Sequence, residues 1–297
     1  MLRCAGFRRG DSVELEEGFP RGGAEMFLNP TIRIGCSGWQ YTHWHGDFYP
    51  AELRQADWLA YYAQRFDTVE INNTFYRLPE ATTFASWRRR APRGFVYAVK
   101  ASRYLTHMKK LKDPVDPLRL FFSRASRLAR ALGPVLYQLP PRWPLNLERL
   151  AAFLAALPRA RRHAIEFREP SWYANDVYAL LERRNVALCL HDMAGSASER
   201  IAVGPFVYVR FHGTQKYSGS YTDAALDAWA DWLAARAAEG RAIYAYFNND
   251  TGGHAPRDAV RLRAALMKRL QGSSRSGVSG RSSTGHSSPG TAGIVRL

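Results

Sequence analysis

Residues 68–79 read TVEINNTFYRLP, a stretch that begins as a buried strand and ends in polar and aromatic side chains. The apolar residues at its start predict a strand with little exposure to water. Two asparagines and a threonine follow, and a hydrophobic core does not supply the hydrogen bonds that these side chains need. Such an end indicates a polar site just beyond the strand. We therefore expect other strands of the chain to end in the same way at the same place.

The same pattern of a short apolar run occurs eight times along the chain. The runs are TIRIGCSGW (31–39), TVEIN (68–72), FVYAVKA (95–101), PVLYQLP (134–140), HAIEFR (163–168), VALCLHD (186–192), FVYVRFHG (206–213) and AIYAYFNND (242–250). Apolar residues spaced by three and four predict amphipathic helices at 53–66, 82–91, 118–132, 147–157 and 223–240. Alternating strands and helices predict a parallel sheet. Eight such units in about 240 residues fit the α/β class, as a single-domain, TIM-barrel-like (β/α)8 fold with outer helices.

A doubly wound open sheet is the alternative fold, but no GxGxxG motif follows the first strand. Residues 1–30 lack a clear period and residues 271–297 are rich in Ser and Gly, so we expect two disordered tails around a folded unit at 31–270. No apolar run is long enough to span a membrane. Three cysteines without CxxC spacing favour a reducing cytoplasm.

Polar side chains stand at the end of nearly every predicted strand. In a (β/α)8 barrel, the C-terminal strand ends and the loops after them form the active site, and residues two apart share a face. This rule predicts one polar mouth lined by Glu70, Asn72, Lys100, Gln138, Glu166, Arg168, Asp192, Arg210, His212, Asn248 and Asp250. Charged residues that only pair with one another inside the barrel would give the same sequence pattern.

The residue types at this mouth allow two kinds of chemistry. Four carboxylates and a histidine are available as ligands of a divalent metal or as an acid and base: Glu70, Glu166, Asp192, Asp250 and His212. Lys100, Arg168 and Arg210 would cancel much of the field that a metal ion needs. They favour an anionic substrate that carries phosphate or carboxylate. We therefore expect no cofactor, with a divalent metal as the alternative.

The positive charge of the chain is concentrated in one segment. Residues 77–168 hold 20 Lys and Arg against 5 Asp and Glu, which is +15 of a net charge of +16. The predicted loop at 102–117 is the most basic of the predicted mouth loops. A segregated surplus of this size predicts a basic face that attracts an anionic partner, nucleic acid included.

Seven motifs together resemble the YecE-like family, TIM-barrel-like proteins named only as a domain of unknown function. They are IGCSGWQYTHWHGDFYP, FDTVEINNTFYRLP, FVYAVKASRYLTHMKKL, LYQLPPRW, EFREPSW, VRFHG and YFNNDTGG, within residues 32–268. The chain departs from the family pattern at Cys36 and Asn73, without a change of charge. The resemblance implies the barrel fold and adds Trp39, Tyr76 and His107 to the expected pocket. It implies no reaction.

We expect an enzyme, of the hydrolase, isomerase or lyase type, that acts on a small or sugar-like anionic substrate. Its expected catalytic residues are Glu70, Glu166, Asp192 and His212. The expected substrate-binding residues are Trp39, Asn72, Tyr76, Lys100, His107, Gln138, Arg168, Arg210 and Asn248. Two alternatives stay open: a nucleic-acid-binding or nucleic-acid-processing protein that uses the basic segment, and a non-catalytic scaffold whose polar residues serve stability alone.

Overall fold

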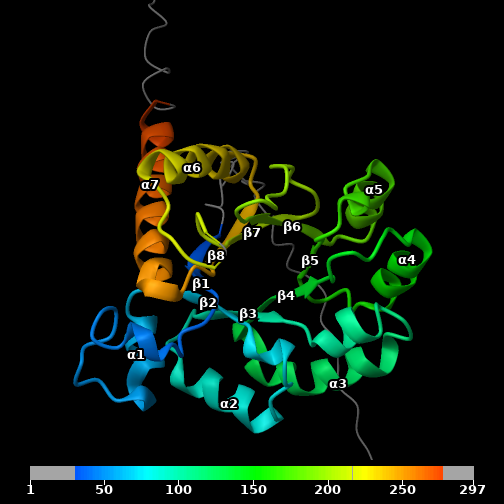
Figure 1. The fold of residues 1–297 in the computed structure, drawn as a ribbon, viewed down its shortest axis with the longest axis horizontal. Coiled ribbons are helices and arrows are strands. Elements are labelled where there is room, and N and C mark those ends of the chain that lie inside the picture. The colour runs from blue at the N-terminus through cyan, green and yellow to red at the C-terminus, as the bar shows by residue number, and fades with distance from the viewer. Residues whose placement is uncertain (1–30, 216, 277–297) are drawn as a thin grey trace, which may run out of the picture.

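Eight parallel strands form the centre of the computed structural model, which describes residues 31–215 and 217–276 (Figure 1). The strands are β1 (Ile32–Cys36), β2 (Thr68–Ile71), β3 (Val96–Lys100), β4 (Leu132–Gln138), β5 (His163–Glu166), β6 (Ala187–Asp192), β7 (Phe206–Phe211) and β8 (Ala242–Phe247). All eight predicted strands are confirmed. So is the fold class, because the strands make a nearly closed (β/α)8 barrel of the TIM type.

Helices surround the strands on the outside (Figure 1). They are α1 (Trp58–Ala63), α2 (Ala81–Arg90), α3 (Val115–Ala125), α4 (Leu147–Ala156), α5 (Asn175–Arg183), α6 (Asp223–Ala238) and α7 (His254–Ser276). Helices α5 and α7 were not predicted from the sequence. Helix α7 continues six residues past the expected boundary at 270. The tail expected at 1–30, and residues 277–297 of the tail expected at 271–297, lie outside the described residues.

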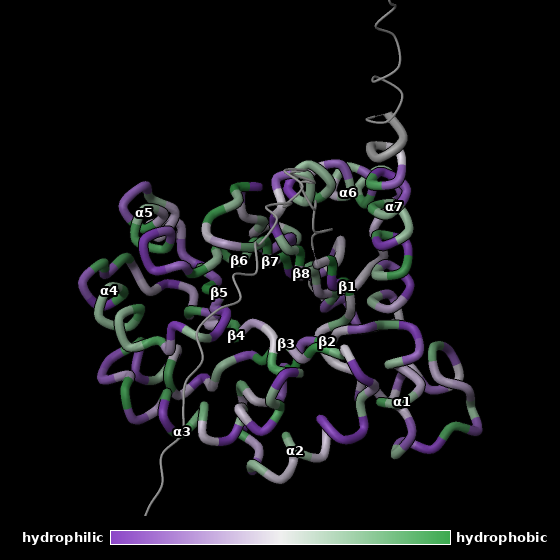
Figure 2. The backbone as a smooth tube through the Cα atoms, turned by 180° about the vertical axis from the view of Figure 1, so that it is seen from behind, coloured by the Kyte–Doolittle hydropathy of each residue, from purple (hydrophilic) through white to green (hydrophobic). Residues whose placement is uncertain are grey.

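The start of a helix and the face that it buries both follow from its sequence, as α6 shows. In α6, the side chain of Thr222 accepts a hydrogen bond from the backbone N–H of Ala225, which is an N-cap. Leu226, Trp229 and Leu233 follow at spacings of three and four and are buried against the barrel. The hydropathy of the chain, seen from behind, alternates along the outer helices in the same way (Figure 2).

The alternation of strand side chains divides the core into two layers. One apolar cluster lies between strands and helices, and it includes Leu188 and Leu190 of β6. The second cluster fills the barrel interior, and it includes Ala187 and Cys189 of the same strand. The interior cluster is aromatic on β7 and β8, where the Tyr208 ring lies 5.3 Å from its neighbour on β8. The polar mouth therefore rests on an aromatic floor.

The barrel has one seam, between β1 and β2, where the described residues form no backbone ladder. Side chains close it. The hydroxyl of Tyr62, on α1, accepts a hydrogen bond from the Cys36 N–H at 2.8 Å and donates to the Thr68 carbonyl at 3.0 Å. Nearer the mouth, Ser37 Oγ donates to Glu70 at 2.6 Å. The seam thus depends on close approach of Tyr62 to two backbones.

Gly35 in β1 makes this approach sterically possible. A Cβ there would lie 2.4 Å from the Thr68 carbonyl oxygen and 2.9 Å from the Tyr62 hydroxyl. We predict that Gly35→Ala lowers the free energy of unfolding by about 1–3 kcal/mol, as overpacking does. Urea denaturation measures the change. Gly272→Ala is the control, because a Cβ at that position meets open space. Equal stabilities of the two variants would contradict the close approach at the seam.

Candidate functional site

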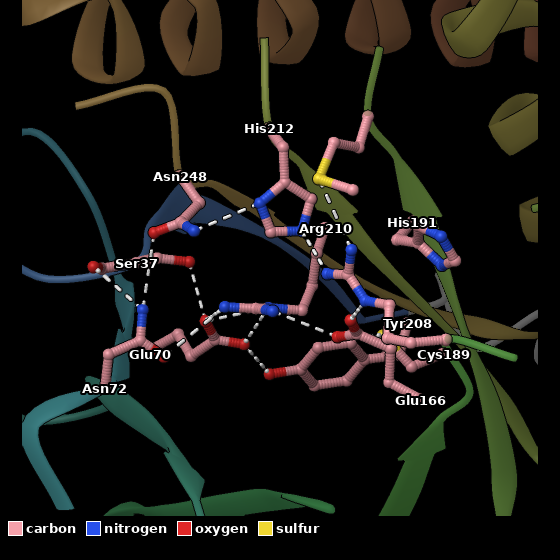
Figure 3. Close-up of polar contacts among 12 residues, drawn as sticks. Ser37, Glu70, Asn72, Glu166, Cys189, His191, Tyr208, Arg210, His212 and Asn248 are labelled. Carbon is pink, nitrogen blue, oxygen red and sulfur yellow. Dashed lines mark hydrogen bonds and ion pairs between the residues drawn. The ribbon is translucent and has the colours of Figure 1, made fainter. Parts of the chain in front are cut away.

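Arg210 lies inside the barrel between two buried glutamates (Figure 3). Its guanidinium bonds Glu70 of β2, with Nη2 to Oε1 at 3.0 Å, and Glu166 of β5, with Nη1 to Oε2 at 3.0 Å. The hydroxyl of Tyr208 donates to Glu70 Oε2 at 2.6 Å. Because Ser37 donates to the other oxygen, both oxygens of Glu70 are already bonded. β2, β5 and β7 are joined across the interior by these bonds.

Arg168, two residues after Glu166, extends this network. Its Nε donates to Glu166 Oε1, and its Nη1 contacts the sulfur of Met193 at 3.4 Å. Its Nη2 donates to Nε2 of His212 at 2.9 Å. The side-chain amide of Asn248 lies 3.1 Å from the other nitrogen of that ring. Both oxygens of Glu166 are therefore held by arginines.

The electrostatics of this network fix the charge states of its members. Burial alone would raise the pKa of Glu166, but the guanidinium groups of Arg168 and Arg210 outweigh it and hold that pKa well below its ordinary value. Burial and the charge of Arg210 hold the pKa of His212 well below its ordinary value. Glu166 is thus a carboxylate and His212 a neutral ring near neutral pH.

Lys100, at the end of β3, is a buried cation of the mouth that lacks an ion pair within the described residues. Its side chain is nine-tenths buried, and its ammonium nitrogen lies 4.3 Å from the ring centre of Phe75. Burial, followed by the positive charge of Arg210, lowers the pKa of Lys100 to about 8. The pKa of the adjoining His107 is also lowered, to about 4, by burial and by Lys100.

A cavity of about 420 Å³ opens beside Arg168, between the loops that follow β5 and β6. Its lining includes His191 of β6, whose Nδ1 is buried and has no hydrogen-bond partner among the described residues. The other ring nitrogen lies 3.4 Å from Ser196 Oγ. Burial, partly offset by Glu166, lowers the pKa of His191 to about 4. A buried ring nitrogen without a hydrogen-bond partner is unusual in a folded protein, and here it belongs to a residue that lines a cavity.

Comparisons with known proteins agree with the fold and with the motifs. Residues 33–280 match the family model described as "Protein of unknown function DUF72". The chain belongs to this family. The crystal structure of a DUF72 family protein, TM1631 from Thermotoga maritima MSB8, matches with a TM-score of 0.74 at 25% identity and covers 80% of this chain and 99% of that one. A DUF72 family protein of Enterococcus faecalis V583, EF0366, gives 0.68 at 18% identity, over 80% and 96% of the two chains, which supports the fold alone.

Two curated relatives carry names without an activity. The UPF0759 protein YunF of Bacillus subtilis (strain 168) is 25% identical over 264 residues, which cover 75% of this chain and 90% of YunF. The UPF0759 protein YecE of Escherichia coli (strain K12) is 32% identical over 144 residues, 48% of this chain. That match spans 50% of the length of YecE. DUF72 membership thus establishes the family of this chain and leaves its reaction to be inferred from the site.

Most of the predicted mouth residues of this DUF72 chain do meet at the C-terminal strand ends. The network and its borders bring together Glu70, Asn72, Lys100, Glu166, Arg168, Arg210, His212 and Asn248. Gln138 is paired in register with Glu166, and its amide makes no hydrogen bond within the described residues. His107 lies over Phe75 at 4.9 Å between ring centres, beside Lys100.

The prediction that Asp192 belongs to the mouth cluster is wrong. Its carboxylate accepts a hydrogen bond from the indole of Trp229 on α6 at 2.6 Å, on the outer side of β6. Asp192 shares its face with Leu190, which packs in the outer layer, whereas His191 shares its face with Cys189 and points inward. Asp250 is separate as well, because its carboxylate faces His43 at 3.7 Å.

Of two expected aromatic residues, Trp39 lies away from the pocket and Tyr76 is exposed at the mouth. Trp39 is buried between the barrel and α2, with its ring 5.6 Å from Trp87 and 6.4 Å from Tyr97. Tyr76 is 71% exposed, and its neighbour Phe75 makes the contact with Lys100 instead. Both were expected because the family motifs place aromatics after strands, but a motif does not say which way a ring turns.

Four residues of the site were not singled out from the sequence: Ser37 as a hydrogen-bond donor, Cys189, His191 and Tyr208. Tyr208 stands two residues before Arg210, so strand alternation gives the signal that places it inside the barrel. The part of the chain that the structure describes contains no group of three or more His, Cys, Asp or Glu side chains arranged to hold a metal ion.

The lowered pKa of Glu166 gives a prediction for stability. Its ordinary value is 4.5, and the value in the folded chain is lower, so its ion pairs stabilise the fold above about pH 4.5 and lose this effect as the pH falls further. We predict that Glu166→Gln lowers the free energy of unfolding by about 3 kcal/mol or more near neutral pH. The difference from the unmodified chain should shrink toward about pH 3.5.

Urea denaturation at the two pH values measures this difference. Glu52→Gln is the matched control, because Glu52 is exposed and forms no ion pair within the described residues. Its effect should be small at both pH values. A Glu166→Gln deficit that stays constant with pH would show that the carboxylate charge is not what stabilises the fold.

Proposed function

We propose that this protein is an enzyme whose barrel mouth binds a small anion that carries phosphate or carboxylate, with Lys100 as the reactive group. The observation that supports this most is the placement of a nine-tenths buried lysine without a carboxylate partner among the described residues. A buried cation is normally paired, and an anionic substrate would supply the missing partner.

The net charge of the mouth favours the same substrate class. Glu70 and Glu166 offset Arg168 and Arg210, which leaves the charge of Lys100 in excess. Because the two glutamates are occupied by arginines, we assign them to positioning Arg168 and Arg210 rather than to acid–base chemistry. His212, a neutral ring that accepts from Arg168, orients that guanidinium toward the mouth.

Lys100 is suited to proton transfer as well as to binding. An amine with a pKa of about 8 loses its proton far more readily than an ordinary lysine does, so both forms occur near neutral pH. The charged form would hold the anion, and the neutral form would take a proton from the substrate. Isomerases and lyases need this chemistry, and hydrolases use it to activate water. The buried, free thiols of Cys36 and Cys189 support a cytoplasmic enzyme.

The cavity beside Arg168 would take the uncharged part of the substrate. Its volume of about 420 Å³ lies in the usual range for small-molecule sites. His191 Nδ1 would find its missing hydrogen-bond partner in a substrate hydroxyl or carbonyl group. A scaffold that kept these residues for stability alone would gain nothing from an unpaired lysine and an unpaired ring nitrogen.

Replacement of Lys100 tests the proposal directly. We predict that Lys100→Met folds but loses the thermal stabilisation that phosphorylated and carboxylated metabolites give the unmodified chain, because the methionine keeps the apolar stem without the charge. Affinity for the same ligand should fall in the unmodified chain as the pH rises through about 8. Thermal shift against a metabolite panel, followed by calorimetry of the hits, measures both effects.

Lys110→Met is the matched control, because Lys110 is an exposed lysine of the loop after β3. It should bind the same ligands as the unmodified chain. If ligand binding survives in Lys100→Met, or is lost equally in the control, Lys100 does not hold the substrate.

His191→Phe separates ligand binding from stability. Nδ1 has no partner within the described residues, and the other ring nitrogen makes only a long contact with Ser196 Oγ, at 3.4 Å. The replacement should therefore leave the free energy of unfolding nearly unchanged. A substrate that bonds this nitrogen should bind about tenfold more weakly to the variant, as the loss of one hydrogen bond implies. Denaturation and calorimetry give the two values. A large loss of stability with unchanged affinity would assign His191 to the fold instead.

A further inference from the structure

The opposite end of the barrel carries an arginine-rich surface that the proposed active site does not use. Five segments lead into β2 to β6 at the N-terminal ends of these strands. They are 64–67, 91–95, 126–131, 157–162 and 183–186, the last of which begins with the final residue of α5. They contain nine arginines, which we call the rim arginines: Arg65, Arg93, Arg127, Arg130, Arg159, Arg161, Arg162, Arg183 and Arg184. Asp67 is the acidic residue of these connections, and it pairs with Arg33 of β1.

The rim arginines are available to a partner. None of the nine forms an ion pair within the described residues, although most charged residues on α6 and α7 do pair. Eight of them are exposed, and Arg161 is half-buried. Such a surplus at one end of the molecule produces a strong positive potential there.

Two hollows shape this surface. The first has a volume of about 280 Å³ and lies between the ends of α4 and α5. Four rim arginines line it: Arg159, Arg161, Arg183 and Arg184. The second, of about 700 Å³, lies between the end of α2 and the start of β4, and its lining includes Arg93 and Arg130. Each hollow therefore presents several guanidinium groups to one bound anion.

Positive charge also lies near the centre of the same end, between the two hollows. Tyr244 of β8 lies at the base of the barrel interior, and the charges of Arg162 and Arg33 both act on its hydroxyl. Arg33 belongs to the lining of the second hollow, while Arg162 adjoins the first in sequence. The positive charge of this end is thus spread over two hollows and the region between them, which is more than one small anion needs.

We propose that this end of the barrel binds the phosphate backbone of a nucleic acid duplex. Guanidinium groups spread over five loops suit a repeating row of phosphates, which each arginine can bind in a bidentate manner. The hollows have no exposed aromatic side chain in their linings, so the surface lacks the stacking platforms that single strands use. The exposed tyrosines Tyr76 and Tyr104 belong instead to segments that follow β2 and β3, at the mouth.

Fluorescence anisotropy with labelled DNA and RNA duplexes of equal length, across a salt series, tests the proposal. The full chain should bind more weakly as salt rises, because counterions are released on binding. The triple variant Arg159→Ala, Arg161→Ala and Arg184→Ala should lower the affinity by about tenfold or more. It should also reduce the salt slope by about one unit for each phosphate that the variant no longer neutralises. Comparison of the affinities for the DNA duplex and the RNA duplex identifies which type of duplex the protein prefers.

The matched control removes three positive charges from the mouth loop, as Arg103→Ala, Lys110→Ala and Lys112→Ala. It should bind duplexes as the unmodified chain does, since these residues lie at the other end of the barrel. Binding that disappears in the control but persists in the rim variant would move the interaction to the mouth and overturn the proposal. So would a flat salt dependence, tighter binding of single strands, or binding to anionic lipid vesicles without binding to duplexes. Thermal melting of both triple variants confirms that they fold.

Discussion

The ion pairs of Arg210 with Glu70 and Glu166 are the interaction on which the rest of the barrel interior depends. All three side chains are fully buried, and their charges are compensated only within the network. Loss of one partner from such a group leaves an uncompensated charge inside the protein, which costs about 3–5 kcal/mol. Through Ser37 the same network reaches β1 and helps to close the seam that backbone hydrogen bonds leave open.

The ion pairs of this network also determine which side chains of the mouth are left to bind a substrate. Since both oxygens of each glutamate are occupied, we assign the carboxylates to holding the arginines in place. The groups with unused bonding capacity surround the network: the ammonium of Lys100 and the ring nitrogen of His191. Low-dielectric surroundings make both groups strong binding partners for a substrate that can pair with them.

The two ends of the barrel differ in how their positive charge is arranged. At the mouth, buried arginines alternate with carboxylates and leave a small surplus in a confined space. At the N-terminal end, exposed arginines have no acidic partners among the described residues and are spread over a broad surface. The first arrangement suits a small molecule and the second suits a polyanion, which is why we propose two kinds of ligand for one basic chain. No helix of the described residues has the length and apolar character to cross a bilayer.

The sequence by itself determined the eight strands, their parallel order and the polar residues at their ends. These follow from local periodicity and from the short reach of strand–helix units, which leave few ways to bury the apolar runs. Only the tertiary structure decided that His191, and not Asp192, faces the interior, because alternation fixes relative faces along a strand but packing against α6 fixes which face is outside. It also decided which charges pair and which stay free. Glu70 and Lys100 have similar positions in the sequence pattern, but distances across the barrel give one a full set of partners and leave the other with none among the described residues.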